Sequence, residues 1–237
     1  MDPLKLSVVV PAYNEEDNLH PLVNDILEAL GDGPSEIILV DDNSSDGTAD
    51  LCDNLAASNP RISCIHRRKG DNGMGYALIE GSRAAKGEYV VWVMADRSDN
   101  LVSIREIVKK LDEGFDMVVA SRYMSGGSRG ELGIDKAMYG STYTKLARLI
   151  FGLPIHDATN AYRGFRRKIL EKAKIESGDF AISPEFAIKA HLAGFRLSEV
   201  PTTYFDRRAG QPKFNMLRMG LRYVSLFRLR LGYRRKT

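Results

Sequence analysis

The sequence predicts an α/β fold, an open twisted sheet of Rossmann type flanked by helices, and three observations favour it. Hydrophobic runs of strand length alternate with helix-length stretches through the first half of the chain, as in a sheet covered by helices on both faces. The helix-length stretches place apolar residues three and four positions apart. Polar residues follow the strand-like runs, where open α/β sheets bind their ligands.

The composition indicates one large domain. The chain has 237 residues, of which 43% are hydrophobic and 27% charged, and this length is enough to bury a sizeable core. Its apolar runs stay below the roughly 18 residues of a membrane-spanning helix, and the start of the sequence lacks a basic signal region. We therefore expect a cytoplasmic protein. Cys52 and Cys64 lie apart in the sequence without metal-ligand spacing, and we interpret them as small hydrophobic residues.

The first half contains five predicted strands and four predicted helices. The strands are the hydrophobic runs 6–13, 36–42, 61–66, 88–96 and 116–123. The helices are the amphipathic stretches 16–30, 48–58, 76–86 and 102–114.

The second half has a different pattern. A Gly/Ser-rich loop leads into a helix near 138–151, and further strands and a helix follow near 157–167, 184–192 and 196–205. We place the catalytic domain at 1–213 and a basic amphipathic helix at 214–237.

Positive charge is concentrated at the end of the chain. From Asp206 to Thr237 there are ten Lys or Arg residues against one acid, while the net charge of the whole chain is +3. This segment is expected to contact an anionic partner, with a membrane surface favoured. Nucleic acid is the weaker alternative, because no recognised nucleic-acid-binding module accompanies the basic residues.

Carboxylates stand at the ends of two predicted strands. Asp41 and Asp42 end the second strand, and adjacent acids there suit a ribose or a base edge. Asp96 and Asp99 follow the fourth strand, directly after the thioether of Met94. Two acids at the end of a buried strand indicate a binding site, although Asp99 alone would also serve as a helix cap.

The motifs, taken in order, resemble those of a known family. "VVVPAYNEEDNL" followed by "ILVDDNSSDGT" is similar to the opening of the family 2 nucleotide-sugar glycosyltransferases, which have the GT-A fold. "RKGDNGMGYALIEG", "VVASRYMSGG", "DATNAYRGFRR" and "EVPTTYFDRRAGQPK" resemble segments of dolichyl-phosphate mannose synthases and related polyprenyl-phosphate glycosyltransferases. The resemblance runs from about Leu6 to Lys213 and implies a mixed sheet in the GT-A arrangement.

The resemblance implies a set of donor-binding residues. Those matching the family's nucleotide-sugar site are Pro11, Tyr13, Asn14, Glu15, Asp42, Asp96 and Lys213.

The family's metal motif is altered in this chain. The family has Asp-Ala-Asp, whose carboxylates hold the Mg²⁺ or Mn²⁺ of the donor diphosphate, and this chain has Met94-Ala95-Asp96. A thioether is a poor ligand for such hard ions, but Mg²⁺ often binds through one or two carboxylates plus phosphate oxygens and waters. We expect a weaker metal site at Asp96, helped by Ser98 or Asp99. The alternatives are diphosphate neutralised by basic residues alone, or lost activity.

Basic residues of the matching motifs are expected to bind phosphate. The expected acceptor-phosphate ligands are Arg122, Arg129, Lys136, Arg163 and Arg207. The catalytic set is expected to be Asp96, Arg122, Arg207 and Asp157.

The resemblance implies an inverting transferase that moves a hexose from GDP-mannose first, or UDP-glucose second, to polyprenyl or dolichyl phosphate. It would work at the cytoplasmic face of a membrane, with or without an anchoring subunit. One alternative is transfer to a non-lipid glycan with a carboxylate such as Asp157 as base. Another is a nucleotide-sugar-binding protein that has lost transfer through Met94.

Overall fold

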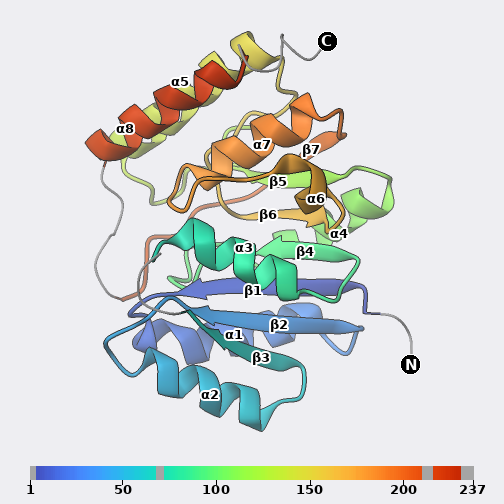
Figure 1. The fold of residues 1–237 in the computed structure, drawn as a ribbon, viewed down its shortest axis with the longest axis vertical. Coiled ribbons are helices and arrows are strands. Elements are labelled where there is room, and N and C mark those ends of the chain that lie inside the picture. Colours follow the sequence, from blue (N-terminus) through green and yellow to red (C-terminus); the bar gives the residue numbers. More distant parts are fainter. Residues whose placement is uncertain (1–3, 68–71, 210–215, 231–237) are drawn as a thin grey trace.

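The chain is built around one seven-stranded mixed sheet. The computed structural model describes residues 4–67, 72–209 and 216–230. The strand order is β3-β2-β1-β4-β6-β5-β7 (Figure 1), and β6 alone among them runs antiparallel to its neighbours. The strands are β1 (Leu6–Ala12), β2 (Ser35–Asp41), β3 (Ile62–His66), β4 (Tyr89–Trp92), β5 (Met117–Ser121), β6 (Arg163–Arg166) and β7 (Leu197–Pro201).

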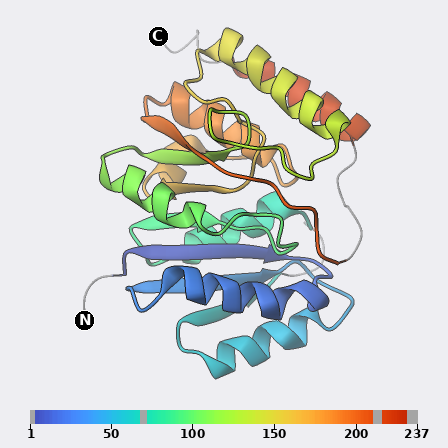
Figure 2. The ribbon, with the colours of Figure 1, turned by 180° about the vertical axis from the view of Figure 1, so that it is seen from behind.

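Helices cover both faces of this sheet. One face carries α1 (Glu16–Leu30), α2 (Thr48–Ser58) and α4 (Ser103–Asp112), which lie in front in Figure 2. The opposite face carries α3 (Met74–Ala84), α5 (Ile134–Phe151), α6 (Ile169–Ala173), α7 (Ile182–Leu192) and α8 (Met216–Ser225), which continues into the short 3-10 helix Leu226–Arg228. α5 and α8 lie alongside each other at one end of the molecule (Figure 1).

Two hydrophobic cores follow from the alternation of side chains along the strands. In β1, Val8 and Val10 pack with α1, α2 and α4, whereas Val9 packs with α3 and the helices of the other face. All three valines are fully buried. Burying a side chain of this size contributes about 1.5–3 kcal/mol, so a strand with both faces covered must be hydrophobic throughout.

The amphipathic pattern predicts α1 correctly. Leu19, Leu22, Val23 and Ile26 are buried on one side of this helix, which is the three- and four-residue spacing of a helix face. The helix ends at Gly31, whose φ of 59° is readily adopted by glycine and whose N–H donates to the carbonyl of Leu27.

The second half differs from the prediction in its details. The region 157–167 yields only the four-residue strand β6, inserted between β4 and β5. The helix expected from Met138 begins at Ile134. The cysteines are not isolated from each other, because α2, which carries Cys52, packs on β3, which carries Cys64.

The C-terminal helix packs on the domain that precedes it. Tyr223 of α8 is buried, and its ring lies 5.6 Å from that of Tyr139 and 4.9 Å from that of Tyr143, centroid to centroid. The expected boundary at 213/214 and the basic end 231–237 lie outside the described residues. Within the described ranges, no helix combines the length and apolar character needed to span a membrane.

Candidate active site

A cavity of about 580 Å³ lies beyond the carboxyl ends of β1, β2, β4 and β5. This is the edge at which an open α/β sheet binds its ligands. Ten of the residues singled out from the sequence line it: Pro11, Tyr13, Glu15, Asp42, Asp96, Ser98, Asp99, Arg122, Lys136 and Arg207.

Asp42 is held at the end of the cavity nearest β2. Its carboxylate accepts from the guanidinium of Arg67 at 2.5 Å and from the N–H of Gly73 at 2.7 Å. Burial raises the pKa of Asp42, and these two donors oppose the shift. Gly73 has a φ of 153°, and a Cβ there would lie 2.2 Å from the carbonyl oxygen of Gly178, so glycine is required at this donor.

Asn14 shapes the same end from outside the cavity. Its backbone has a φ of 51°, and its side-chain oxygen accepts from the N–H of Ser45 at 2.8 Å. The N–H of Asn14 in turn donates to the hydroxyl of Ser44 at 3.0 Å. Asn14 therefore ties the loop after β1 to the loop after β2, which positions the neighbouring Tyr13 and Glu15.

Asp96 and Asp99 both line the cavity, and they lie close enough to interact. The N–H of Ser98 donates to Asp96 at 3.1 Å, and the N–H of Met94 donates to Asp99 at 2.8 Å. Burial raises the pKa of Asp99 to about 7, and the charge of Asp96 adds to the shift. Met94 packs against the core on the α3 side. Two mutually repelling carboxylates next to a hydroxyl are a donor set that suits Mg²⁺ or Mn²⁺.

Arg122 is fixed by Asp157. Its Nε and Nη2 donate to the two carboxylate oxygens of Asp157 at 2.7 and 3.0 Å. Burial alone would lower the pKa of Arg122, but the Asp157 carboxylate outweighs it and the net shift is upward. Asp157 is fully buried, also accepts from Thr159 and from the N–H of Asn160, and is not among the cavity-lining residues described. Asp157 therefore holds Arg122 in one orientation, and both of its carboxylate oxygens accept hydrogen bonds from neighbouring groups.

Arg207 enters the cavity from the segment after β7. Its Nη2 lies 3.0 and 3.2 Å from the two carboxylate oxygens of Glu15, and its Nε donates to the carbonyl of Ala209 at 2.8 Å. The side chains of Arg207 and Glu15 are 13% and 7% exposed. This pair joins the loop after β1 to a segment almost two hundred residues further along the chain.

Two basic residues predicted at the site, Arg163 and Arg129, lie outside the cavity lining. Arg163 is fully buried, lies over the ring of Trp92, and donates to the carbonyls of Ser183 and Ala158 at 2.8 and 3.2 Å. Burial lowers its pKa to about 10. Arg163 is therefore a core residue and does not reach a phosphate in the cavity. Arg129 is exposed and donates to the carbonyl of Leu132, outside the cavity lining. Lys213 falls outside the described residues.

The sequence analysis missed an apolar wall on one side of the cavity. Tyr139 of α5, Phe180 before α7, and Met219 and Tyr223 of α8 form it. Tyr204 and Asp206, after β7, also line the cavity. The amphipathic pattern of the last helix was the available signal, because its buried side chains had to face some part of the domain.

The comparisons with known proteins agree with this geometry. The family model described as Glycosyl transferase family 2 matches residues 7–173. The chain belongs to glycosyltransferase family 2. The match spans β1 to α6 and includes the strand ends that carry the acids and Arg122.

Curated relatives of this family 2 chain are named for one type of acceptor. It is 32% identical over 215 residues to the polyprenol monophosphomannose synthase of Mycolicibacterium smegmatis, covering 88% of this chain and 80% of the relative. It is 28% identical over 240 residues to the undecaprenyl-phosphate mannosyltransferase of Micrococcus luteus, covering 98% and 96%. It is 29% identical to the dolichol-phosphate mannosyltransferase of Pyrococcus furiosus, covering 89% and 59%.

Solved structures support the GT-A fold of this family 2 chain. The glucosyl-3-phosphoglycerate synthase of Mycobacterium tuberculosis, in complex with Mg²⁺ and UDP, superimposes with a TM-score of 0.73. It is 19% identical, and the match covers 96% of this chain and 79% of that one. The same enzyme in complex with Mn²⁺, UDP and glucosyl-3-phosphoglycerate gives a TM-score of 0.68.

Proposed function

We propose that the chain transfers a hexose, mannose in the first place, from a nucleoside-diphosphate sugar to a polyprenyl or dolichyl phosphate. The observation that carries the proposal is one cavity with two kinds of wall. Part of its lining consists of acids and arginines suited to a sugar diphosphate, and part consists of aromatic and apolar side chains suited to a prenyl chain. The names of the curated relatives support the same acceptor and mannose as the sugar.

The donor nucleotide is assigned to the end formed by Pro11, Tyr13, Glu15 and Asp42. Asp42 supports this assignment, because its carboxylate is preorganised by Arg67 and Gly73 at the cavity edge. A fixed acceptor oxygen suits a ribose hydroxyl or a base N–H.

Asp96 and Asp99, with Ser98, are the residues that would hold Mg²⁺ or Mn²⁺. Burial has already raised the pKa of Asp99, and a cation would relieve its repulsion with Asp96. Such an ion supplies charge stabilisation at the donor diphosphate. The loss of one aspartate at Met94 leaves a smaller ligand set, which favours a weaker site than the family's two-acid motif.

Arg122 and Arg207 are the cations assigned to the reacting phosphates. Arg122 is locked by Asp157 into one orientation, so it pays little conformational entropy when it binds an oxyanion. Arg207 is held by Glu15 and would turn to phosphate when the substrate arrives. The acceptor phosphate is already anionic and attacks the anomeric carbon in line with the departing nucleoside diphosphate, so no side-chain base is required.

The acceptor is assigned to the wall made by α5 and α8, and the same two helices support contact with a membrane surface. Their inner side chains line the cavity, while their outer faces expose large hydrophobic residues. These are Ile134, Met138, Leu146, Leu149, Leu221 and Val224. Arg228 and Arg230 are exposed close by in sequence, where they would meet lipid phosphates. A cytoplasmic membrane face, with or without an anchoring subunit, is the corresponding location.

Met94 favours a second candidate, a nucleotide-sugar-binding protein without transfer. The two are separated by incubating the purified chain with radiolabelled GDP-mannose or UDP-glucose and either polyprenyl phosphate or a soluble glycan. We expect label in the lipid fraction, with GDP-mannose the better donor. Donor binding without transfer to any acceptor would support the second candidate, and label only in the glycan would overturn the assigned acceptor.

A further inference from the structure

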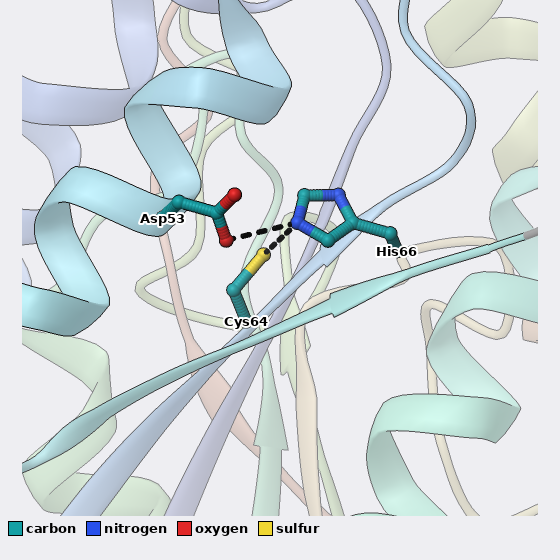
Figure 3. A group of neighbouring side chains, drawn as sticks. All are labelled: Asp53, Cys64 and His66. Carbon is teal, nitrogen blue, oxygen red and sulfur yellow. Dashed lines mark hydrogen bonds and ion pairs between the residues drawn. The ribbon is translucent and has the colours of Figure 1, made fainter.

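A second cluster of metal-ligating side chains lies outside the cavity. Asp53 of α2 and Cys64 and His66 of β3 converge at the surface, as Figure 3 shows. Nε2 of His66 lies 3.0 Å from a carboxylate oxygen of Asp53 and 3.4 Å from the sulfur of Cys64. Cys64 and His66 are two residues apart on a strand, so both side chains point to the same face of the sheet.

A buried carboxylate orients the histidine. Nδ1 of His66 lies 3.2 Å from an oxygen of Asp41, whose side chain is 5% exposed. The other oxygen of Asp41 accepts from the N–H of Ser44 at 3.0 Å, so Asp41 is itself fixed. Metal-binding histidines typically give their second ring nitrogen to such a carboxylate, which sets the tautomer and leaves the lone pair for the metal.

The three ligand types and their spacing suit zinc. Zn²⁺ takes thiolate, imidazole and carboxylate at bond lengths of about 2.0–2.3 Å, which places ligand atoms of a tetrahedral site roughly 3.3–3.6 Å apart. The candidate atoms all lie within 4.8 Å of one another. Because the Asp53 side chain is 68% exposed, solvent reaches the site and can fill a fourth position. A thiolate makes Mg²⁺ a poor match for this cluster.

We propose that Asp53, Cys64 and His66 bind a zinc-class divalent cation, with Asp41 orienting His66. The site is separate from the Asp96 and Asp99 pair and stands whether or not the chain transfers a sugar.

The location gives this site a structural role beside the donor pocket. Arg67 follows His66, donates its N–H to the carbonyl of Asp41 at 2.9 Å, and holds Asp42 through its guanidinium. A cation at Asp53, Cys64 and His66 would bind α2 to the end of β3 and brace the residues behind Asp42. A ligand that binds only the folded state raises the unfolding temperature, so zinc is expected to stabilise the chain.

The test uses the full chain, stripped of metal and kept reduced so that the Cys52 and Cys64 thiols stay free. Zn²⁺ is titrated against a chromophoric chelator, and Co²⁺ is used as a spectroscopic probe. We expect one equivalent of zinc outside the cavity, a thiolate-to-cobalt charge-transfer band, and a higher unfolding temperature with zinc. The Asp96→Ala variant should still bind one equivalent of zinc, show the thiolate-to-cobalt band and unfold at a higher temperature with zinc.

Variants assign the ligands. Cys64→Ser should abolish the charge-transfer band, and His66→Gln or Asp53→Asn should weaken zinc at least about tenfold. Cys52→Ala is the matched control, since it removes the neighbouring thiol but no proposed ligand, and it should retain the band. Absence of zinc uptake by the folded native chain would overturn the proposal and leave His66 as an ion-pair partner of Asp41 and Asp53. A band that persists in Cys64→Ser would overturn it as well.

Discussion

A carboxylate oxygen of Asp99 accepts the backbone N–H of Met94 at 2.8 Å. Met94 stands where the resembled family has the first aspartate of its metal motif, so this bond brings another carboxylate back to the altered position. Asp96 lies close enough to raise the pKa of Asp99 further. The loop after β4 therefore still brings two acids to the cavity despite the methionine, and one of them, Asp99, lies five residues beyond Met94 in the sequence.

Replacing Asp99 by Asn should weaken metal binding without unfolding the chain. The amide oxygen can still accept the N–H of Met94, whereas the negative charge is lost. We expect the Mg²⁺ concentration for half-maximal transfer to rise about tenfold or more. Asp99→Ala is the comparison, since it also removes the acceptor and should lower the unfolding free energy by about 1–3 kcal/mol. An unchanged Mg²⁺ requirement in Asp99→Asn would remove Asp99 from the metal site.

The pair of Arg122 and Asp157 should be important for both stability and transfer. Asp157→Asn leaves a buried guanidinium without its counter-ion, and breaking such a pair costs about 3–5 kcal/mol. The partly exposed pair of Arg166 and Glu88 is the control, and Glu88→Gln should cost at most about 1 kcal/mol. Both are measured by denaturant unfolding.

Measuring sugar transfer by the Arg122→Lys variant distinguishes the contribution of the orientation of Arg122 from that of its positive charge. Lysine keeps the positive charge but cannot make the two parallel hydrogen bonds of a guanidinium to Asp157. We expect kcat to fall while the affinity for nucleoside diphosphate changes little. If Asp157→Asn were as stable as the native chain and yet inactive, Asp157 would be a base and its positioning role would be wrong.

Arg207 should contribute to transfer more than to folding. Its partner Glu15 lies at the cavity edge, and both side chains are accessible from the cavity. Arg207→Lys, which keeps a cation beside the buried Glu15, should reduce kcat by at least about tenfold with a small change in Tm. Arg166→Lys, which alters the partly exposed pair with Glu88 away from the cavity, is the matched control and should leave kcat unaltered. Equal losses in the two variants would deny Arg207 a specific role.

The outer faces of α5 and α8 should control attachment to lipid vesicles. Leu221→Glu and Val224→Glu place charge at side chains that are 80% and 62% exposed, so folding should tolerate them. Sedimentation with vesicles of phosphatidylcholine and phosphatidylglycerol should show at least about tenfold weaker binding for the double variant. Val102→Glu is the control, because Val102 is 73% exposed next to α4 on the other face of the sheet. Equal vesicle binding by the double variant Leu221→Glu/Val224→Glu and by the control Val102→Glu would disprove a docking role for α8.

The regular part of this fold was predictable because its signals are local. The buried strands appear in the sequence as hydrophobic runs. The helices α1 and α2 begin and end at the same residues as their amphipathic patterns. β6 was harder to predict because it has four residues, two of them arginine, and is stabilised by β4 and β5, which are distant in sequence.

The sequence predicted the candidate site as a set of residues at strand ends, but it did not predict which residues these side chains contact. The motif around Arg163 predicts a phosphate ligand. In the structure, however, Arg163 is buried in the core and donates to the carbonyls of Ser183 and Ala158. The group of Asp53, Cys64 and His66 was missed because its members come from different elements and join only through the packing of α2 on β3. Such partners are set by tertiary structure, which spacing along the chain does not report.

The most direct test of the central claim is sugar transfer from GDP-mannose to polyprenyl phosphate, measured with Mg²⁺, with Mn²⁺ and with EDTA. Three chains are compared: native, Asp96→Ala and Met94→Asp. We predict that the native chain requires metal, that Asp96→Ala loses at least about a hundredfold in kcat, and that Met94→Asp works at lower metal concentration. Native transfer that is undiminished in EDTA, or unaffected by Asp96→Ala, would contradict the account.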